Sequence, residues 1–203
     1  MRFRPSIIVP AAGPGSRFGG AVHKLMQPFE GSTVLGMTLR HAVESQLPVL
    51  LVTTAQMLPL AGKMLARRDI VVLNEAEAAR GMGASIAVGI AERSGAPGWL
   101  VLPGDMPLVQ SSTLLAVAGA LEQHAVVYAQ HRGRRGHPVA FAAELYSELM
   151  QLMQLSNDDG LRRLMLRYPA HGEDTADGGV LLDVDTPRDL DALRRAAEQA
   201  AAR

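Results

Sequence analysis

The chain has 203 residues, which is enough for one sizeable domain but leaves little room for two independent cores. Because 20 acidic residues balance 20 basic ones, no net field favours binding to nucleic acid or to an anionic membrane, and we expect neither as a partner. Cysteine is absent, which excludes disulfides, thiolate metal sites and a cysteine nucleophile, and is compatible with a reducing cytoplasm.

The apolar stretches of the chain are too short for membrane insertion or secretion. Pro10 interrupts the apolar run that follows the basic start, so a secretory signal is not expected. No run approaches the roughly 18 to 20 apolar residues that cross a bilayer. We therefore expect a single cytoplasmic domain over residues 1–203.

Short runs rich in β-branched residues alternate with longer stretches of helical spacing. Strands are expected, in chain order, at 6–10, 49–53, 70–74, 99–103, 125–130, 138–141 and 180–184. Helices are expected at 35–45, 58–67, 85–93, 112–124, 142–155, 159–167 and from 187 onward. Ser111 and Ser112 are suitable caps for the fourth helix. Thr186, Pro187 and Asp189 open the last helix with a capping hydroxyl, a proline and an acid.

Strands that are apolar throughout and alternate with helices are typical of a parallel sheet covered on both faces. We predict an α/β fold: a three-layer α/β/α, Rossmann-like domain with a mostly parallel sheet, in which residues 125–141 form an antiparallel excursion. Ligands of such sheets bind beyond the carboxyl ends of the strands. A glycine-rich loop, Asp105 and Asp185 each follow a predicted strand, so we expect them to converge on one site.

The glycine-rich loop, residues 11–20, follows the first predicted strand directly. Glycines let backbone amides approach phosphate oxygens, and the small Ala11 and Ala12 leave room for a base or ribose. Arg17 and Lys24 add positive charge. The spacing matches neither a Walker P-loop nor the G-x-G-x-x-G dinucleotide fingerprint. The pattern indicates a phosphate-binding loop; a flexible turn with a solvated arginine and lysine is the alternative.

Two acidic segments are candidates for a metal site. Asp105 lies in a Pro-Gly-Asp-Met-Pro turn, and Asp185 precedes Thr-Pro. Mg²⁺ takes one or two carboxylates together with phosphate oxygens and water, so this pair is chemically adequate. Each acid also has a structural interpretation, as a turn residue or a helix entry. Asp183 and Asp189 are assigned structural positions, at a strand end and in the first turn of a helix.

Several segments resemble, in the same order, the motifs of nucleotidyltransferases with the MobA-like fold. They are Ala-Ala-Gly-Pro-Gly-Ser-Arg-Phe-Gly at 11–19 with Lys24-Leu25, Gly-Met-Gly-Ala-Ser at 81–85, Gly-Asp-Met-Pro at 104–107, Gly-His-Pro-Val-Ala-Phe at 136–141, Asn-Asp-Asp-Gly-Leu-Arg at 157–162 and Asp-Val-Asp-Thr-Pro-Arg-Asp-Leu at 183–190. Guanylyltransferases of this fold more often begin Leu-Ala-Gly-Gly, so Ala12 favours the cytidylyltransferase branch. That branch joins CMP from CTP to the phosphate of molybdopterin. Asn157 and Leu161 depart from the family's Gly and Ala, which weakens the identity of the acceptor but not nucleotidyl transfer.

The resemblance implies a role for each matched residue. The nucleotide would be bound by Ala11, Ala12, Gly13, Gly15, Ser16, Gly19, Gly81, Gly83 and Ser85. Arg17 and Lys24 would act in catalysis by neutralising phosphate charge, and Asp105 and Asp185 would hold Mg²⁺. His137 and Arg162 would face the acceptor. Capping also explains Ser85, packing explains His137, and solvation explains Arg162.

The resemblance implies a magnesium-dependent transfer of CMP from CTP to molybdopterin. One alternative is an enzyme that uses GTP or another phosphorylated acceptor, such as a sugar or polyol phosphate. A second is a non-catalytic protein that binds the cofactor and delivers it to a molybdoenzyme, which would then be a partner. The arginines at 132, 134 and 135 form either a solvated loop or part of an acceptor site. No Ser-His-acid or G-x-S-x-G pattern supports a hydrolase.

Overall fold

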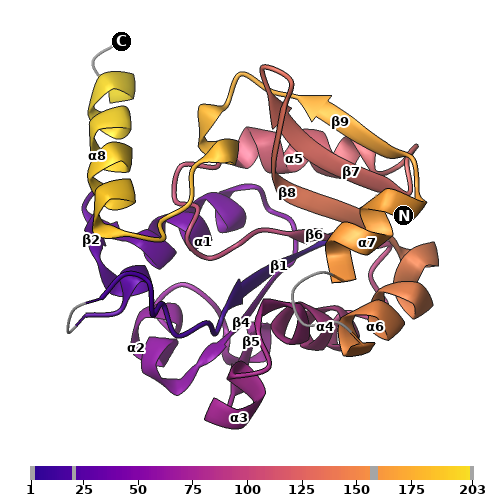
Figure 1. Cartoon of the computed structure of the whole chain (residues 1–203), viewed down its shortest axis with the longest axis horizontal. Coiled ribbons are helices and arrows are strands. Elements are labelled where there is room, and N and C mark those ends of the chain that lie inside the picture. Colours follow the sequence, from indigo (N-terminus) through magenta and orange to yellow (C-terminus); the bar gives the residue numbers. More distant parts are fainter. Residues whose placement is uncertain (1–2, 20–21, 156–159, 202–203) are drawn as a thin grey trace.

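The computed structural model describes residues 3–19, 22–155 and 160–201. Its main feature is a seven-stranded sheet with the order β5-β4-β1-β6-β8-β7-β9 (Figure 1). These strands are β5 (Ile70–Leu73), β4 (Val49–Thr54), β1 (Ser6–Ala11), β6 (Gly98–Val101), β8 (Arg134–Ala142), β7 (Val126–His131) and β9 (Ala170–Asp174). β8 is antiparallel to its neighbours β6 and β7, and every other pair is parallel. The predicted mostly parallel sheet with an antiparallel excursion is therefore confirmed.

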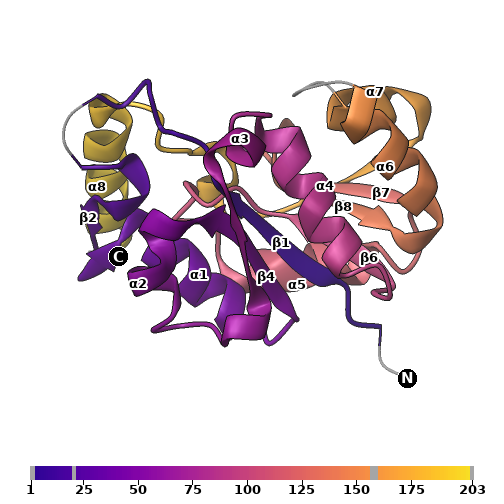
Figure 2. The ribbon, with the colours of Figure 1, turned by 90° about the horizontal axis from the view of Figure 1, so that it is seen from below.

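Helices cover both faces of the sheet, as predicted (Figure 2). One face carries α1 (Val34–Glu44) and α5 (Ser111–Ala120), and the other carries α4 (Met82–Glu92), α6 (Tyr146–Leu155) and α7 (Gly160–Arg167). The remaining α-helices are α2 (Leu58–Ala61), α3 (Glu75–Ala78) and α8 (Pro187–Ala201). Short 3₁₀ turns occur at η1 (Lys24–Met26), η2 (Ala55–Met57), η3 (Arg67–Asp69), η4 (Ala143–Leu145) and η5 (Gly178–Leu181). Strands β2 (Pro28–Phe29) and β3 (Ser32–Thr33) form a small separate hairpin. Among the described residues, no helix has both the length and the apolar character needed to span a bilayer.

The alternation of side chains along β1 separates two hydrophobic cores. Ile7 and Val9 pack on the α1 and α5 side, whereas Ile8 packs on the α4 side, and all three are fully buried. Helix α4 approaches the sheet closely, because a Cβ on Gly89 would come within 2.4 Å of the side chain of Ile8. Two buried faces explain why the central strands are continuous apolar runs rather than alternating ones.

Several sequence predictions differ from the structure, three of them in the bounds or type of an element. The helix expected at 58–67 ends at Ala61, because the chain turns at Gly62. α5 is capped at Gln110 and not by Ser111 or Ser112, and it ends at Ala120. The strand expected at 180–184 is wrong: the chain forms η5 at this point, and the polar segment 170–174 takes the edge of the sheet as β9.

Asp177 is the buried acid that starts η5. Its carboxylate accepts hydrogen bonds from the backbone N–H groups of Gln110 and Gly179, at 2.8 Å each, and from the hydroxyl of Thr113 at 2.8 Å. The side chain therefore joins the start of α5 to the segment that leads to Asp183 and Asp185. A hydrogen bond to a charged acceptor contributes more to stability than a bond between neutral groups, so these three bonds stabilise the local fold.

We expect Asp177→Ala to lower the free energy of unfolding by about 3 kcal/mol, because it removes the charged acceptor of three hydrogen bonds, two of which are buried. Urea denaturation measures this loss. Asp174→Ala is the matched control, since Asp174 is exposed and, within the described part of the chain, accepts a single side-chain bond, from Gln130. Its effect should stay within about 0.5 kcal/mol. Equal losses for the two variants would contradict the role given to Asp177.

Candidate active site

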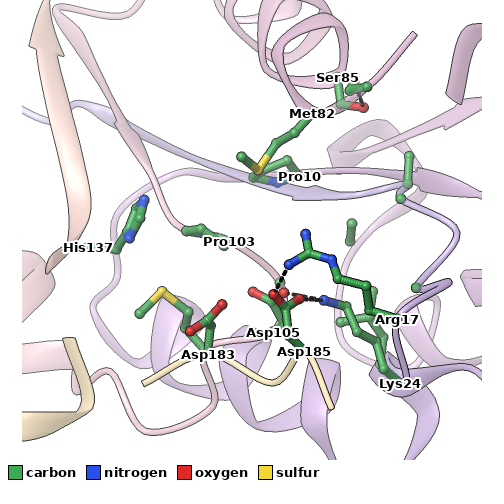
Figure 3. A pocket seen from close by; sticks show the side chains of 18 of the residues that line it. Pro10, Arg17, Lys24, Met82, Ser85, Pro103, Asp105, His137, Asp183 and Asp185 are labelled. Carbon is green, nitrogen blue, oxygen red and sulfur yellow. Dashed lines mark hydrogen bonds and ion pairs between the residues drawn. The ribbon is translucent and has the colours of Figure 1, made fainter. Parts of the chain in front are cut away.

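A cavity of about 560 Å³ lies beyond the carboxyl ends of β1 and β6. Its walls are the loop after β1, the start of α4, the turn after β6, the first half of β8 and the segment between η5 and α8 (Figure 3). The glycine loop, Asp105 and Asp185 meet there. Asp185 does not follow a strand; instead the N–H of Val184 donates to the carbonyl of Asp105 at 3.0 Å and draws its segment to β6.

Most of the nucleotide-binding candidates line this cavity. They are Ala11, Ala12, Gly13, Gly15, Ser16, Gly81 and Ser85. Gly19 and Gly83 do not line it: Gly19 lies in an exposed turn, and Gly83 is buried within α4. Ala11 and Ala12 are buried on opposite sides of the sheet, so larger side chains at either position would have to displace the core.

The start of α4 forms the wall opposite the acidic residues. Gly81 has a φ of 92°, a conformation that favours glycine. Ser85 is buried, and its hydroxyl donates at 3.5 Å to the carbonyl of Gly81, four residues earlier. It does not cap α4, because the helix already begins at Met82. Met82, which the sequence analysis did not select, is exposed and borders the cavity. A small, partly apolar wall of this kind suits a nucleobase or ribose.

Lys24 and Arg17 place positive charge beside the acids. The Lys24 ammonium donates to Asp105 Oδ2 at 2.7 Å and to Asp185 Oδ1 at 2.9 Å. The Arg17 guanidinium donates to the other oxygen of Asp185 at 2.5 Å, from a largely exposed position. Burial alone would lower the pKa of Lys24, but the two carboxylates outweigh it and raise that pKa above its ordinary value. Lys24 is therefore charged and connects the loop to both acidic segments.

His23 is a second residue that the sequence analysis missed. Its Nδ1 accepts a bond from the N–H of Leu25 at 3.2 Å, which leaves Nε2 to donate to the carbonyl of Gly13 at 2.9 Å. The imidazole thus joins η1, which carries Lys24, to the glycine loop. A Cβ on Gly15 would come within 3.2 Å of this ring, so His23 also explains one of the glycines.

Three carboxylates, and not two, form the acidic centre. Oxygens of Asp105, Asp183 and Asp185 lie within 4.8 Å of one another. Asp105 Oδ1 is buried and has no hydrogen-bond partner among the described residues, an arrangement that is costly unless a cation or a bound water satisfies it. Partial burial and the nearby charge of Asp105 raise the pKa of Asp183. Clustered hard oxygens with one unsatisfied atom fit a divalent cation such as Mg²⁺ or Mn²⁺.

Asp189 fixes the backbone that carries Asp185. One of its carboxylate oxygens accepts from the N–H of Asp185 at 3.2 Å and from the N–H of Thr186 at 2.6 Å. The Thr186 hydroxyl also donates to it, and this bond is the main reason why the pKa of Asp189 is lowered. The predicted capping arrangement at the start of α8 is confirmed, and it has a second effect, since it orients a residue of the acidic centre.

We expect Asp189→Ala to reduce the rate of the nucleotidyl transfer implied by the sequence about tenfold, because Asp185 is then no longer held in position. Loss of the cap should also lower the free energy of unfolding by about 1 kcal/mol. Asp191→Ala is the control, because Asp191 is exposed on the same helix and contacts only Arg194 among the described residues. Initial rates and urea denaturation check both parts. A rate equal to that of the control would contradict the positioning role.

Of the two residues expected to face the acceptor, the structure places the side chain of one at the cavity. His137 lines the cavity, and burial lowers its pKa although the charges of Asp105 and Asp183 oppose the shift. Arg162 belongs to α7, but its side chain lies outside the part of the chain that the structure describes. Gly136 precedes His137 and allows η5 to approach, because a Cβ there would meet the carbonyl oxygen of Val180 at 2.2 Å.

The arginine cluster is split by the hairpin. Arg132 occupies the turn between β7 and β8, with a φ of 50°. Arg134 and Arg135 are exposed, but they belong to β8 and border the cavity, so they are not parts of a loop. The sequence showed the charges, but it did not show that the strand extends to Arg134.

Comparisons with known proteins agree with this geometry. The family described as "MobA-like NTP transferase domain" matches residues 7–175. Molybdenum cofactor cytidylyltransferase from Escherichia coli (strain K12) is 25% identical over 183 residues, which cover 90% of this chain and 92% of that protein. Purine catabolism protein PucB from Bacillus subtilis (strain 168) is 29% identical over 198 residues, or 92% of this chain and 94% of its own.

Solved structures of the protein Rv0371c from Mycobacterium tuberculosis H37Rv are similar over nearly the whole chain. One has a TM-score of 0.80 at 28% identity and covers 96% of this chain and 99% of the other. A second, a complex with manganese, has a TM-score of 0.76 at 25% identity and covers 95% and 99%. A divalent metal therefore occurs in a protein of this fold.

Proposed function

Because the chain belongs to the family of MobA-like NTP transferase domains, and is thus a nucleotidyltransferase, we propose that it transfers CMP from CTP to the phosphate of molybdopterin. The observation that carries nucleotidyl transfer is the contact of Lys24 with Asp105 and Asp185 beside the glycine loop. The name of the E. coli relative and the Ala12 of the loop support CTP and molybdopterin. We also propose a single domain with a cytoplasmic location, which the lack of cysteine fits.

Asp105 and Asp185, with Asp183 beside them, would hold Mg²⁺ or Mn²⁺. The bound ion would supply positive charge to the phosphate oxygens of the nucleotide. The buried, unsatisfied oxygen of Asp105 and the manganese complex of a relative support a divalent cation. The Lys24 ammonium occupies the same carboxylates in the free chain, so it must exchange partners when metal and nucleotide arrive.

The side chains of the protein orient the substrates and stabilise charge. Backbone amides of the glycine loop hold the triphosphate, and the wall formed by Gly81, Met82 and Ser85 holds the base and ribose. An oxygen of the acceptor phosphate attacks the α-phosphorus, and the bond from that phosphorus to the oxygen bridging to the β-phosphate breaks. Arg17 and Lys24 stabilise the charge that passes to pyrophosphate as it leaves. His137 and Arg162 lie on the acceptor side in this proposal.

The departures Asn157 and Leu161 favour a second candidate within the same reaction class. These residues fall in the segment that the family uses near the acceptor, so another phosphorylated acceptor, or GTP as the donor, is the alternative. A carrier that delivers the cofactor to a molybdoenzyme without catalysis is disfavoured, because Lys24 and the acids are arranged to stabilise the charge of a reacting phosphate group.

Pyrophosphate release decides among these functions. The purified chain is incubated with each of CTP, GTP, ATP and UTP, with Mg²⁺ or Mn²⁺, and with or without molybdopterin. We expect release with CTP only when molybdopterin is present. Release with GTP, or with a sugar phosphate in place of molybdopterin, would assign the second candidate. Nucleotide binding without any release would indicate a carrier.

A further inference from the structure

Strand β8 carries an oriented cation at the cavity wall, on Arg135. The Cζ atom of Arg135 lies 4.2 Å from the centroid of the Tyr128 ring, a distance at which the ring face attracts a guanidinium. Tyr128, on the adjacent strand β7, packs against the core on the α4 and α6 side. Among the described residues, no carboxylate lies within ion-pair distance of Arg135. Its N–H donors are therefore oriented and available to a ligand in the cavity.

Strand β8 borders the cavity on the side of the acids that lies away from Arg17 and Lys24. Arg135 and His137 lie two residues apart on β8 and both line the cavity, although the register of β8 on β7 shifts between Arg135 and Val139. The imidazole of His137 is close enough to Asp105 and Asp183 to feel their charges. Figure 3 shows His137 on one side of the three acids, with Arg17 and Lys24 on the other. The order across the cavity is therefore His137 of β8, the three acids and then Arg17 and Lys24.

In-line displacement requires the acceptor and the leaving pyrophosphate to be bound on different sides of the cavity. The attacking oxygen and the departing pyrophosphate lie on opposite sides of the α-phosphorus. If the loop cations receive the pyrophosphate, the acceptor phosphate approaches from β8. One divalent cation does not cancel the charge of three carboxylates and a nucleotide triphosphate, so an approaching phosphate dianion is still repelled and this side needs a fixed positive charge of its own. A guanidinium binds phosphate with two parallel N–H bonds, which also orient the attacking oxygen.

We propose that Arg135, held in place by the ring of Tyr128, binds the phosphate group of the acceptor, and that β8 thereby selects phosphate monoesters. This inference rests on the proposed nucleotidyl transfer but does not require molybdopterin as the acceptor. Tyr128 is a positioning residue, since it acts through Arg135. Arg134 borders the cavity too, but no aromatic ring or carboxylate among the described residues orients its side chain.

The kinetic test compares variants of the strand with a control in the turn. We expect Arg135→Ala to raise the KM for molybdopterin about tenfold to thirtyfold, with the KM for CTP within about twofold, because one charged bidentate contact is lost. Tyr128→Leu should raise the KM for the acceptor severalfold, whereas Tyr128→Phe keeps the ring and should behave as the native chain does. Arg132→Asn removes an equal charge from a position that tolerates asparagine and should change neither constant.

Phosphate binding can be measured directly, which tests the Arg135 subsite even if the chain does not use molybdopterin as a substrate. Inorganic phosphate is titrated calorimetrically into the chain saturated with CTP in the absence of acceptor. Binding by the native chain and Arg132→Asn, with at least tenfold weaker binding by Arg135→Ala, supports the subsite. Lack of phosphate binding by the native chain, or equal binding by all three, overturns it. An unchanged KM for the acceptor in an active Arg135→Ala enzyme also overturns it, whereas an inactive native chain refutes only the proposed function.

Discussion

Replacing Asp105 by asparagine is expected to slow nucleotidyl transfer by a factor of about 10² to 10³, the usual loss when one preorganised charge-stabilising group is removed. The amide keeps the shape of the side chain but loses the charge that binds the Lys24 ammonium. It also places a neutral group where the buried, unsatisfied oxygen lies. Metal affinity in the presence of CTP should fall together with the rate, because the same carboxylate serves both.

The fold should survive this change. Asp105 helps to hold the segment that carries Asp185 through its backbone carbonyl, which the substitution leaves in place. Initial rates over a range of Mg²⁺ and Mn²⁺ concentrations, together with a thermal melt, separate metal binding from folding. Asp191→Asn provides the control, since it removes an equal charge from an exposed position on α8. Full activity of a folded Asp105→Asn variant would remove this residue from the proposed centre.

Replacing Lys24 by methionine should produce an equally large loss of rate, about 10² to 10³-fold, with the opposite effect on the metal. The ammonium stabilises charge on the nucleotide, so its removal slows the reaction. In the free chain, however, it donates to oxygens of both Asp105 and Asp185. Without this competitor the carboxylates repel one another and attract a divalent cation more strongly.

The Lys24→Met variant is informative because its reaction rate should fall while its affinity for the divalent cation should rise. We expect Mg²⁺ without nucleotide to raise the Tm of Lys24→Met by more than it raises the Tm of the native chain, while pyrophosphate release is nearly lost. Lys63→Met is the matched control, because Lys63 is exposed and does not line the cavity. A Tm shift with Mg²⁺ equal to that of the native chain would show that Lys24 and the metal do not share these carboxylates.

The central part of the fold was predictable because burial on two faces leaves a clear pattern. β1, β4, β5 and β6 are largely apolar, and all were predicted within a few residues. β9 was not, since the edge segment Ala170–Asp174 is polar and is held in the sheet by backbone pairing with β7. A strand was wrongly expected at 180–184, where Val180 and Val184 are buried although the chain forms the end of η5 and an irregular segment.

The sequence by itself indicated the family, the glycine loop and the two acids at 105 and 185, because short motifs resemble those of the family and occur in the same order. Only the tertiary structure decided that Asp183 joins these acids, that Lys24 bridges two of them, and that Arg135 borders the same cavity. Lys24 is separated along the sequence by 81 positions from Asp105 and by 161 positions from Asp185. Local patterns report backbone preference and burial, whereas contacts across such separations depend on how η5, β6 and β8 pack together.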